Sequence, residues 1–307
     1  MPANRPLSRT FIKLAARLVG GKSRGHAQDW IPGLRLVPAS PTELGSIYHQ
    51  GILAGRLVSG GVAIHTQSPH VYIVGTGPSI EGCDLSLTES KSCILLNGAL
   101  HLMSNHIKTP LAVVIEDERF VWNHFDLLER IPLNCPCVFS VSVIRAVCER
   151  NRDWLQERQV VLYDDLRKPY RHKRRSISEL RGLPFVRLSP DGEAGFSTEP
   201  DAGVFRGGSV VISAVQLALS LRVRTIGFLG IDINNANQPR FYEKAVRSFS
   251  GIQKGQDRIL RHLVVAKEYA SEKGVMLKNY SPISALEALG LEYSDRFSRK
   301  LPAYIVS

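Results

Sequence analysis

The chain has 307 residues, of which 44% are hydrophobic and 22% charged, and a formal net charge of +11. This composition is that of a globular protein with a substantial core, and it excludes a wholly disordered chain. Five cysteines without a CxxC pair argue against a disulfide framework and a zinc site, so we expect a reducing, cytoplasmic compartment. The sequence contains no apolar run of about 18 residues, which excludes a membrane-spanning helix.

The excess of positive charge predicts an anionic partner. Nucleic acid, anionic lipid headgroups and a phosphorylated or carboxylated substrate all fit a net charge of +11. Nucleic acid is disfavoured, because no RRM, KH, zinc-finger or helix-turn-helix signature is present.

Residues 1–45 are expected to form a basic amphipathic helix followed by a linker. Leu7, Phe11, Leu14 and Leu18 fall on one helical face, with basic residues around the other. Such a helix can lie in a membrane interface, although it could equally be a packing helix or a tail. Residues 20–45 are rich in Gly, Pro and Ser, so we expect the ordered domain to begin near Tyr48.

From there, short apolar runs alternate with helical patterns, and residues 46–307 are interpreted as one Rossmann-like domain with an insertion at residues 164–206. The expected strands are Val71 to Val74, Cys93 to Leu96, Leu111 to Ile115, Cys137 to Val141, Val160 to Tyr163, Thr225 to Leu229 and Val275 to Tyr280. The expected helices are Val121 to Glu129, Val143 to Asp153, Val210 to Leu221 and Gln256 to Lys273. This alternation predicts an α/β fold with a single Rossmann-like parallel sheet and helices on both faces.

One segment, residues 164–206, is too long and too polar for a simple connection, so we interpret it as a mobile insertion near the site that forms a basic lid. Its first half is strongly basic and includes Arg171 and Arg174. These residues could form a solvated charge run, a nucleic-acid patch or a clamp on an anionic substrate. We take Arg171 and Arg174 as candidate substrate contacts.

The most informative motif follows the first parallel strand. There an apolar run ends in a glycine turn made of Gly75, Thr76, Gly77, Pro78 and Ser79. Bare backbone amides at the carboxyl end of a strand suit a phosphorylated ligand. The spacing fails the GxGxxG pattern and lacks the Lys-Ser/Thr pair of a Walker loop, which disfavours NAD and P-loop hydrolysis. A turn with a purely conformational role remains open.

Three other segments carry candidate site residues. A second glycine turn, with Gly208 and Ser209, opens a long helix, and the later strand ends at Asp232. Asp117 lies in an acidic triplet after a strand, which could bind a divalent metal, cap the next helix or contact substrate.

The motifs resemble those of the Kdo transferases of lipopolysaccharide core assembly, of the WaaZ type. The matching pieces read LLNGALHLMSN, PLAVVIEDERFV, ISAVQLALSLRVRTIGFLGID, PRFYEKA and KNYSPISAL. More distantly, the order of the GTGPS turn, an Asn after the second strand, a hydroxyl residue before a long helix and GID resembles that of the bacterial CMP-sialic acid sialyltransferases. Both families use CMP esters of 2-keto-3-deoxy sugar acids.

The resemblance implies a metal-independent, inverting enzyme of the GT-A variant type, without a cofactor, that transfers Kdo from CMP-Kdo. Its acceptor would be a lipid-linked lipopolysaccharide core at the cytoplasmic face of the inner membrane. The glycine turn and Asn97 would hold the donor, Ser209 would meet its carboxylate or cytidine, and Arg240 and Tyr242 would neutralise the departing phosphate. Preorganised donors of this kind lower the barrier to cleaving a glycosyl phosphate.

The chain departs from the sialyltransferase pattern in two ways. Thr76 stands where those enzymes carry Asn, and Asp257 stands near the position of their histidine base. A carboxylate can deprotonate an acceptor hydroxyl within hydrogen-bond reach. Asp257 could instead be a helix cap, and His262 is an alternative base with a structural role as its own alternative.

Two other functional classes stay open. A pterin-pyrophosphokinase-like enzyme would share a similar sheet and glycine turn but would need a nucleoside triphosphate and metal. A non-catalytic adaptor would bind nucleotide and use its basic surface to dock on lipid or protein.

Overall fold

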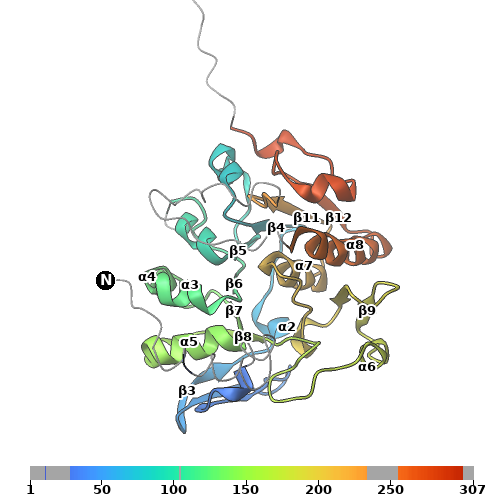
Figure 1. Ribbon diagram of the computed structural model, residues 1–307. Coiled ribbons are helices and arrows are strands. Elements are labelled where there is room, and N and C mark those ends of the chain that lie inside the picture. The colour runs from blue at the N-terminus through green and yellow to red at the C-terminus, as the bar shows by residue number, and fades with distance from the viewer. Residues whose placement is uncertain (1–10, 12–27, 104, 234–254, 300–307) are drawn as a thin grey trace, which may run out of the picture.

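A central sheet of ten strands organises the protein in the computed structural model (Figure 1). The structure describes Phe11 and residues 28–103, 105–233 and 255–299. Among these residues, none of the helices is both long enough and apolar enough to cross a membrane. The expected amphipathic N-terminal helix lies outside the described residues, apart from the exposed Phe11.

The strands lie in the order β1-β2-β3-β8-β7-β6-β5-β4-β11-β12, and every pair from β3 to β12 is parallel. The bounds of the parallel strands are β3 Ile52–Leu57, β4 His70–Val74, β5 Cys93–Leu96, β6 Ala112–Ile115, β7 Cys137–Ser140, β8 Val160–Tyr163, β11 Thr225–Leu229 and β12 Met276–Asn279. The mostly parallel α/β sheet predicted from the sequence is therefore confirmed, and all seven expected strands are present.

The direction in which strands are added reverses at β4. From β4 to β8 each new strand pairs on the same side, whereas β11 pairs on the opposite side of β4 and β12 continues outward. The order of the strands therefore reverses at β4, and in open α/β sheets ligands bind beyond the carboxyl ends of the strands at such a point.

Helices cover both faces of the sheet, as expected. In Figure 1 the helices α3 (Glu118–Asn123), α4 (Phe125–Glu129) and α5 (Val141–Asn151) lie on one side, and α7 (Val210–Ser220) and α8 (Gln256–Glu272) lie on the other. The strand pattern explains the two layers, because successive side chains point to opposite faces. In β4, Tyr72 and Val74 join the first core, whereas Val71 and Ile73 join the second.

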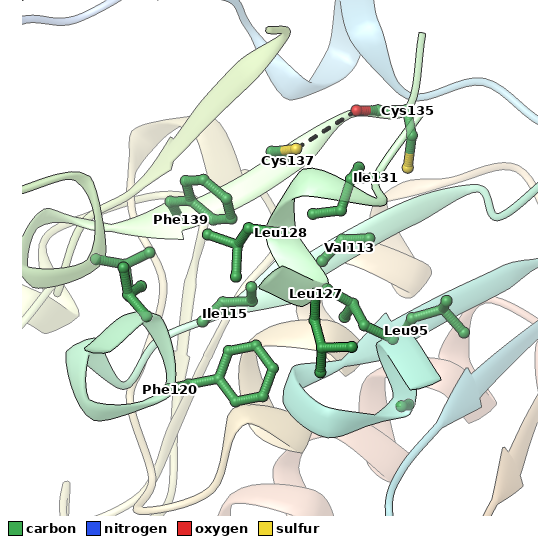
Figure 2. Packing of buried hydrophobic residues seen from close by; sticks show 14 of the residues in the cluster. Leu95, Val113, Ile115, Phe120, Leu127, Leu128, Ile131, Cys135, Cys137 and Phe139 are labelled. Carbon is green, nitrogen blue, oxygen red and sulfur yellow. Dashed lines mark hydrogen bonds between the residues drawn. The ribbon is translucent and has the colours of Figure 1, made fainter. Parts of the chain in front are cut away.

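The first core is built from branched and aromatic side chains of β5, β6 and β7 packed against α3 and α4. Figure 2 shows Val113, Ile115 and Phe139 of the sheet facing Phe120 and Leu128 of the helices. The expected helix Val121 to Glu129 is present as two helices, because the backbone breaks at His124, whose φ is −139°.

Short 3-10 helices link these elements. Their bounds are Gln28–Trp30, Pro78–Gly82, Leu85–Leu87, Asn97–Leu102, Arg152–Leu155, Pro200–Ala202, Ala285–Leu289 and Asp295–Phe297.

The prediction that the ordered domain begins near Tyr48 was wrong. Strand β1 (Leu34–Val37) lies inside the expected linker and pairs antiparallel with β2 (Gly45–His49), which pairs antiparallel with β3. The side chain of Leu34 is fully buried. The Gly and Pro residues that suggest a linker instead shape the turns of this three-stranded meander.

Arg145 of α5 holds the segment that leads into β1, the first strand of the meander. Its side chain is fully buried and donates to the carbonyl oxygens of Ile31 and Pro32 at 2.8 Å each and to the side chain of Gln28 at 2.9 Å. A single guanidinium therefore satisfies several backbone acceptors that would otherwise be buried without a donor.

The insertion at residues 164–206 has regular structure of its own. It contains α6 (Ile177–Arg181), the antiparallel strands β9 (Val186–Leu188) and β10 (Gly195–Ser197), and a small core of Leu166, Leu180, Val186 and Phe205. Asp201 from this segment accepts hydrogen bonds from the amides of Gly60 and Gly61 at the start of α2 (Gly60–Ala63). Whether the insertion acts as a lid stays a prediction.

Replacing Arg145 should destabilise the whole domain. In Arg145→Met the carbonyl groups of Ile31 and Pro32 lose their donor, and we expect the free energy of unfolding to fall by roughly 3 kcal/mol. Urea unfolding followed by circular dichroism measures this loss. Arg150→Met, on the same helix but exposed, is the matched control and should change stability by no more than about 0.5 kcal/mol. An Arg145→Met protein as stable as the wild type would contradict this role.

Candidate functional site

The candidate site lies at the carboxyl edge, defined here as the edge of the sheet where the parallel strands end. Residues 75–79 follow β4, Asn97 follows β5, Glu116 follows β6 and residues 230–232 follow β11. Ser209 begins α7, which runs back from this edge across β4, β5 and β6. The topology thus brings the predicted motifs to one edge at the point where strand order reverses.

The two loops at the reversal are tied to one another. The amide of Gly75 donates to the carbonyl oxygen of Leu229 at 2.8 Å, and that of Gly77 donates to Gly230 at 2.9 Å. The amide and hydroxyl of Ser79 donate to the carboxylate of Asp232 at 2.8 and 2.5 Å. These contacts fix the loop after β4 against the loop after β11.

This geometry corrects the expectation of bare amides in the first glycine turn. Gly75, Gly77 and Ser79 donate their amides within the protein, and Pro78 has none. In the described part of the chain, the Thr76 amide is the one amide of the turn without a protein acceptor. A phosphate at this turn would therefore meet side chains and one amide rather than a nest of several.

The glycines are required because two backbones approach closely. A β-carbon on Gly75 would collide with the carbonyl oxygen of Gly230, and one on Gly77 would collide with the carboxylate of Asp232. Gly230 itself has a φ of +64°, in the left-handed region that favours glycine. The turn sequence therefore encodes the contact between the loops.

Asp232 has a positioning role in this arrangement. Its side chain is 7% exposed, and burial raises the pKa of this carboxyl, while hydrogen bonds from Ser79 oppose that rise. The preceding residue, Ile231, is held by Ser281 and Ser284, whose hydroxyls bond its amide and carbonyl at 2.9 and 2.7 Å. Contact between Asp232 and a ligand stays a prediction.

Asn97 has the features of a ligand-binding residue. Its φ is +44°, in the left-handed region that Asn adopts more readily than most residues other than glycine. Its side-chain oxygen is buried and accepts no hydrogen bond from the described residues. A buried acceptor without a partner calls for an explanation, and a ligand can supply the missing donor.

Ser209 is the N-cap of α7, and its hydroxyl accepts from the amide of Val211 at 3.4 Å. Gly208 before it has a φ of +91°. The second predicted turn is therefore a real helix start with a partly exposed hydroxyl at the carboxyl edge.

Sequence reasoning missed Arg206 and its partner Glu116. The Nε atom of Arg206 lies 3.3 Å from a carboxylate oxygen of Glu116, whose other oxygen accepts a hydrogen bond from Ser213 of α7. Glu116 is 9% exposed, whereas the Arg206 side chain is 37% exposed. The pair links the end of β6 to the second glycine turn and places a cation at the carboxyl edge. Arg206 stands in the FRGGS turn, but its partner Glu116 lies 90 residues away in the sequence, so no local motif indicates the pair.

Asp117 is engaged in a local structure. Its carboxylate accepts from the amide of Arg119 at 2.9 Å, as the N-cap of α3, and forms an ion pair with the Arg119 side chain at 2.5 Å. Burial alone would raise the pKa of Asp117, but the hydrogen bonds from Arg119 lower it overall. The contacts of Asp117 are therefore those of a helix cap, one of the three roles that its position suggests. No three His, Cys, Asp or Glu side chains in the described ranges are grouped to hold a metal ion.

The remaining predicted residues lie in three places. Asp257 is exposed in the first turn of α8, and the helix cap is Gly255, so the cap alternative for Asp257 was wrong. Arg171 donates to the carbonyl oxygen of Leu34 in β1 at 3.1 Å, and Arg174 is exposed. Arg240 and Tyr242 lie outside the described residues.

His262 is tied to the insertion. It is 3% exposed, and its Nδ1 lies 3.1 Å from the amide nitrogen and 2.8 Å from the carbonyl oxygen of Gly195. One tautomer accepts from the amide and the other donates to the carbonyl. Burial lowers the pKa of His262, and nearby arginines lower it further.

Comparison with solved structures finds a likeness to the sialyltransferase CstII from Campylobacter jejuni, described in complex with the substrate analogue CMP-3FNeuAc. The identity is 13%, the match covers 76% of this chain and 89% of that one, and the TM-score is 0.37. No protein-family model matches the chain, and a search of curated proteins finds no match.

The buried histidine predicts a pH dependence of stability. Because the pKa of His262 in the folded protein lies below its ordinary value of 6.5, only the unfolded chain gains its proton just below that pH. The free energy of unfolding should therefore fall as the pH drops from about 6.5, with a slope of up to about 1.4 kcal/mol per pH unit from this group.

Urea unfolding between about pH 5 and 7 in His262→Gln should show a shallower slope than in the wild type. His172→Gln, at an exposed position, is the control. Equal slopes in wild type and His262→Gln would contradict the assignment.

Proposed function

We propose that the protein is a glycosyltransferase that moves Kdo, or a related 2-keto-3-deoxy sugar acid, from its CMP donor to a lipopolysaccharide inner-core acceptor. The observation that carries the proposal is Asn97, whose buried side-chain oxygen at the carboxyl edge accepts no hydrogen bond from the described residues. It lies in the LLNGAL motif of the resemblance and follows the strand next to the GTGPS turn. A cytosine amino group or a sugar hydroxyl is a donor of the kind that its side-chain oxygen lacks.

In the proposed reaction, the acceptor hydroxyl oxygen attacks the anomeric carbon of the donor and forms the new glycosidic bond. The bond from that carbon to the phosphate oxygen breaks, CMP leaves with the electron pair, and the configuration inverts. Asp257 takes the proton of the hydroxyl, for which its exposed place at the start of α8 leaves room. Arg240 and Tyr242 stabilise the charge that develops on the leaving phosphate.

No metal takes part in this proposal. The acidic triplet after β6 supports that view, because Glu116 is paired with Arg206 and Asp117 with Arg119. Those carboxylates would have to give up their cations to bind a divalent ion. Arg206, Ser209 and the amide of Thr76 are the groups available to meet an anionic donor.

The lipid-linked acceptor and the membrane surface belong to the same proposal. In the basic half of the insertion, Lys168 is neutralised by Asp29 at 2.5 Å. Lys173 and Arg174 are exposed, and Arg175 donates to the carbonyl oxygen of Leu166, which carries no net charge. Each basic residue near an anionic surface contributes roughly 1 kcal/mol, so this segment can help to hold the protein there.

The first test is nucleotide selectivity. CMP should raise the melting temperature more than UDP, GDP or ATP, and EDTA should leave the shift intact, since side-chain donors take the place of a metal. At a CMP concentration about 100 times the dissociation constant, the stabilisation is roughly 2.7 kcal/mol. A preference for UDP with obligatory Mn²⁺ would sink the proposal. Mg²⁺-dependent ATP binding would favour the pterin-pyrophosphokinase-like class, and nucleotide binding without transfer would favour the adaptor.

The second test separates chemistry from binding at Asp257. Asp257→Asn should lower the rate of sugar transfer by roughly 100- to 10,000-fold with nearly unchanged affinity for CMP, because a general base acts on the acceptor. Asp153→Asn, at an exposed carboxylate between the end of α5 and the start of β8 and so at the opposite edge of the sheet, is the control. Full transfer activity in Asp257→Asn would remove this residue from the mechanism.

A further inference from the structure

Arg258, in the first turn of α8, lies directly over the second glycine turn. Its Nε atom donates to the carbonyl oxygen of Gly207 at 3.1 Å. A β-carbon on Gly208 would collide with the guanidinium, so the absence of a side chain at Gly208 is what admits Arg258 to this position. Among the described residues this hydrogen bond holds the base of the guanidinium, and the side chain remains exposed.

The charge of Arg258 is not compensated within the described residues. No carboxylate there pairs with it, whereas Arg206 pairs with Glu116 and Arg261, one turn further along α8, pairs with Asp191. Arg167 and Arg258 both lie close enough to His262 to lower its pKa. Among the described residues no carboxylate pairs with Arg167, whose guanidinium donates to the carbonyl oxygens of Gly192 and Glu193 at 2.8 and 2.7 Å. A carbonyl oxygen satisfies hydrogen-bond donors but carries no net charge.

The helices reinforce this positive field. Helices α7 and α8 pack against each other, and the contact of Arg258 with Gly207 and Gly208 brings both of their N-termini to the same place on the carboxyl edge. No side chain caps the start of α8, where the N-cap is Gly255. Two helix dipoles therefore point their positive ends at the region occupied by the Arg258 guanidinium.

We propose that Arg258 binds an anionic group of the substrate, a phosphate or a carboxylate, beside Ser209. The guanidinium presents donors in a planar fork that matches either group, and Gly208 positions it. The identity of the substrate rests on the proposed function, but the anion site itself rests on the charge and geometry of Arg258. Both the phosphate of a CMP donor and the carboxylate of a sugar acid have the required chemistry.

Titration calorimetry can distinguish these two sources. The ligands are CMP, cytidine and a free 2-keto-3-deoxy sugar acid, each with wild type and Arg258→Gln. Loss of a charged hydrogen bond should weaken CMP or the sugar acid by about 10- to 100-fold and leave cytidine affinity within twofold. The ligand that loses affinity identifies the anionic group, and Arg258→Lys should recover part of it by restoring the charge.

Arg261→Gln is the matched control, because it removes an exposed arginine of the same helix whose charge is already paired. It should leave all three affinities within twofold of wild type. Equal losses in Arg261→Gln and Arg258→Gln, or an equal loss for cytidine, would overturn the inference.

Inorganic phosphate tests the site without any nucleotide. At matched ionic strength, phosphate should raise the melting temperature of the wild type more than that of Arg258→Gln. An equal shift in the two proteins would overturn the anion site. A greater shift in the wild type together with no CMP binding would retain the anion site and reject the proposed donor.

Discussion

The structure of the candidate site depends on the clamp between Ser79 and Asp232. These residues follow β4 and β11, the two strands at which the direction of strand addition reverses, and they lie more than 150 positions apart in the sequence. The buried carboxylate of Asp232 accepts both donors of Ser79, so the two loops cannot separate without exposing or orphaning a buried charge.

The clamp gives the glycines of the first turn a structural role. Taken alone, a GTGPS turn indicates backbone amides that are available to a phosphate. In the structure, most of these amides instead donate hydrogen bonds to the neighbouring strand and loop. Gly75 and Gly77 are small because the loop after β11 occupies the space of their side chains. In the proposed function, ligand recognition therefore falls to side chains at the carboxyl edge, namely Asn97, Arg206 and Ser209, together with Arg258.

The parallel strands were predictable because each is a continuous apolar run bounded by turn residues, and β5, β8 and β11 have the expected bounds. The meander of β1 to β3 was not, because its strands are partly exposed and interrupted by glycine, a pattern that also suits a linker. At the site, Asn97 and Ser209 could be proposed from local motifs. The Glu116 to Arg206 pair and the place of Arg258 could not, since they follow from contacts between residues 51 to 90 positions apart.

A crystal structure of the protein with CMP would test the central claim most directly, namely that the ligand site lies at the carboxyl edge beside β4 and β11. The account predicts the nucleotide beside Thr76, with a ligand donor on the side-chain oxygen of Asn97. Nucleotide bound at the amino edge of the sheet, or against the helices away from both loops, would contradict it.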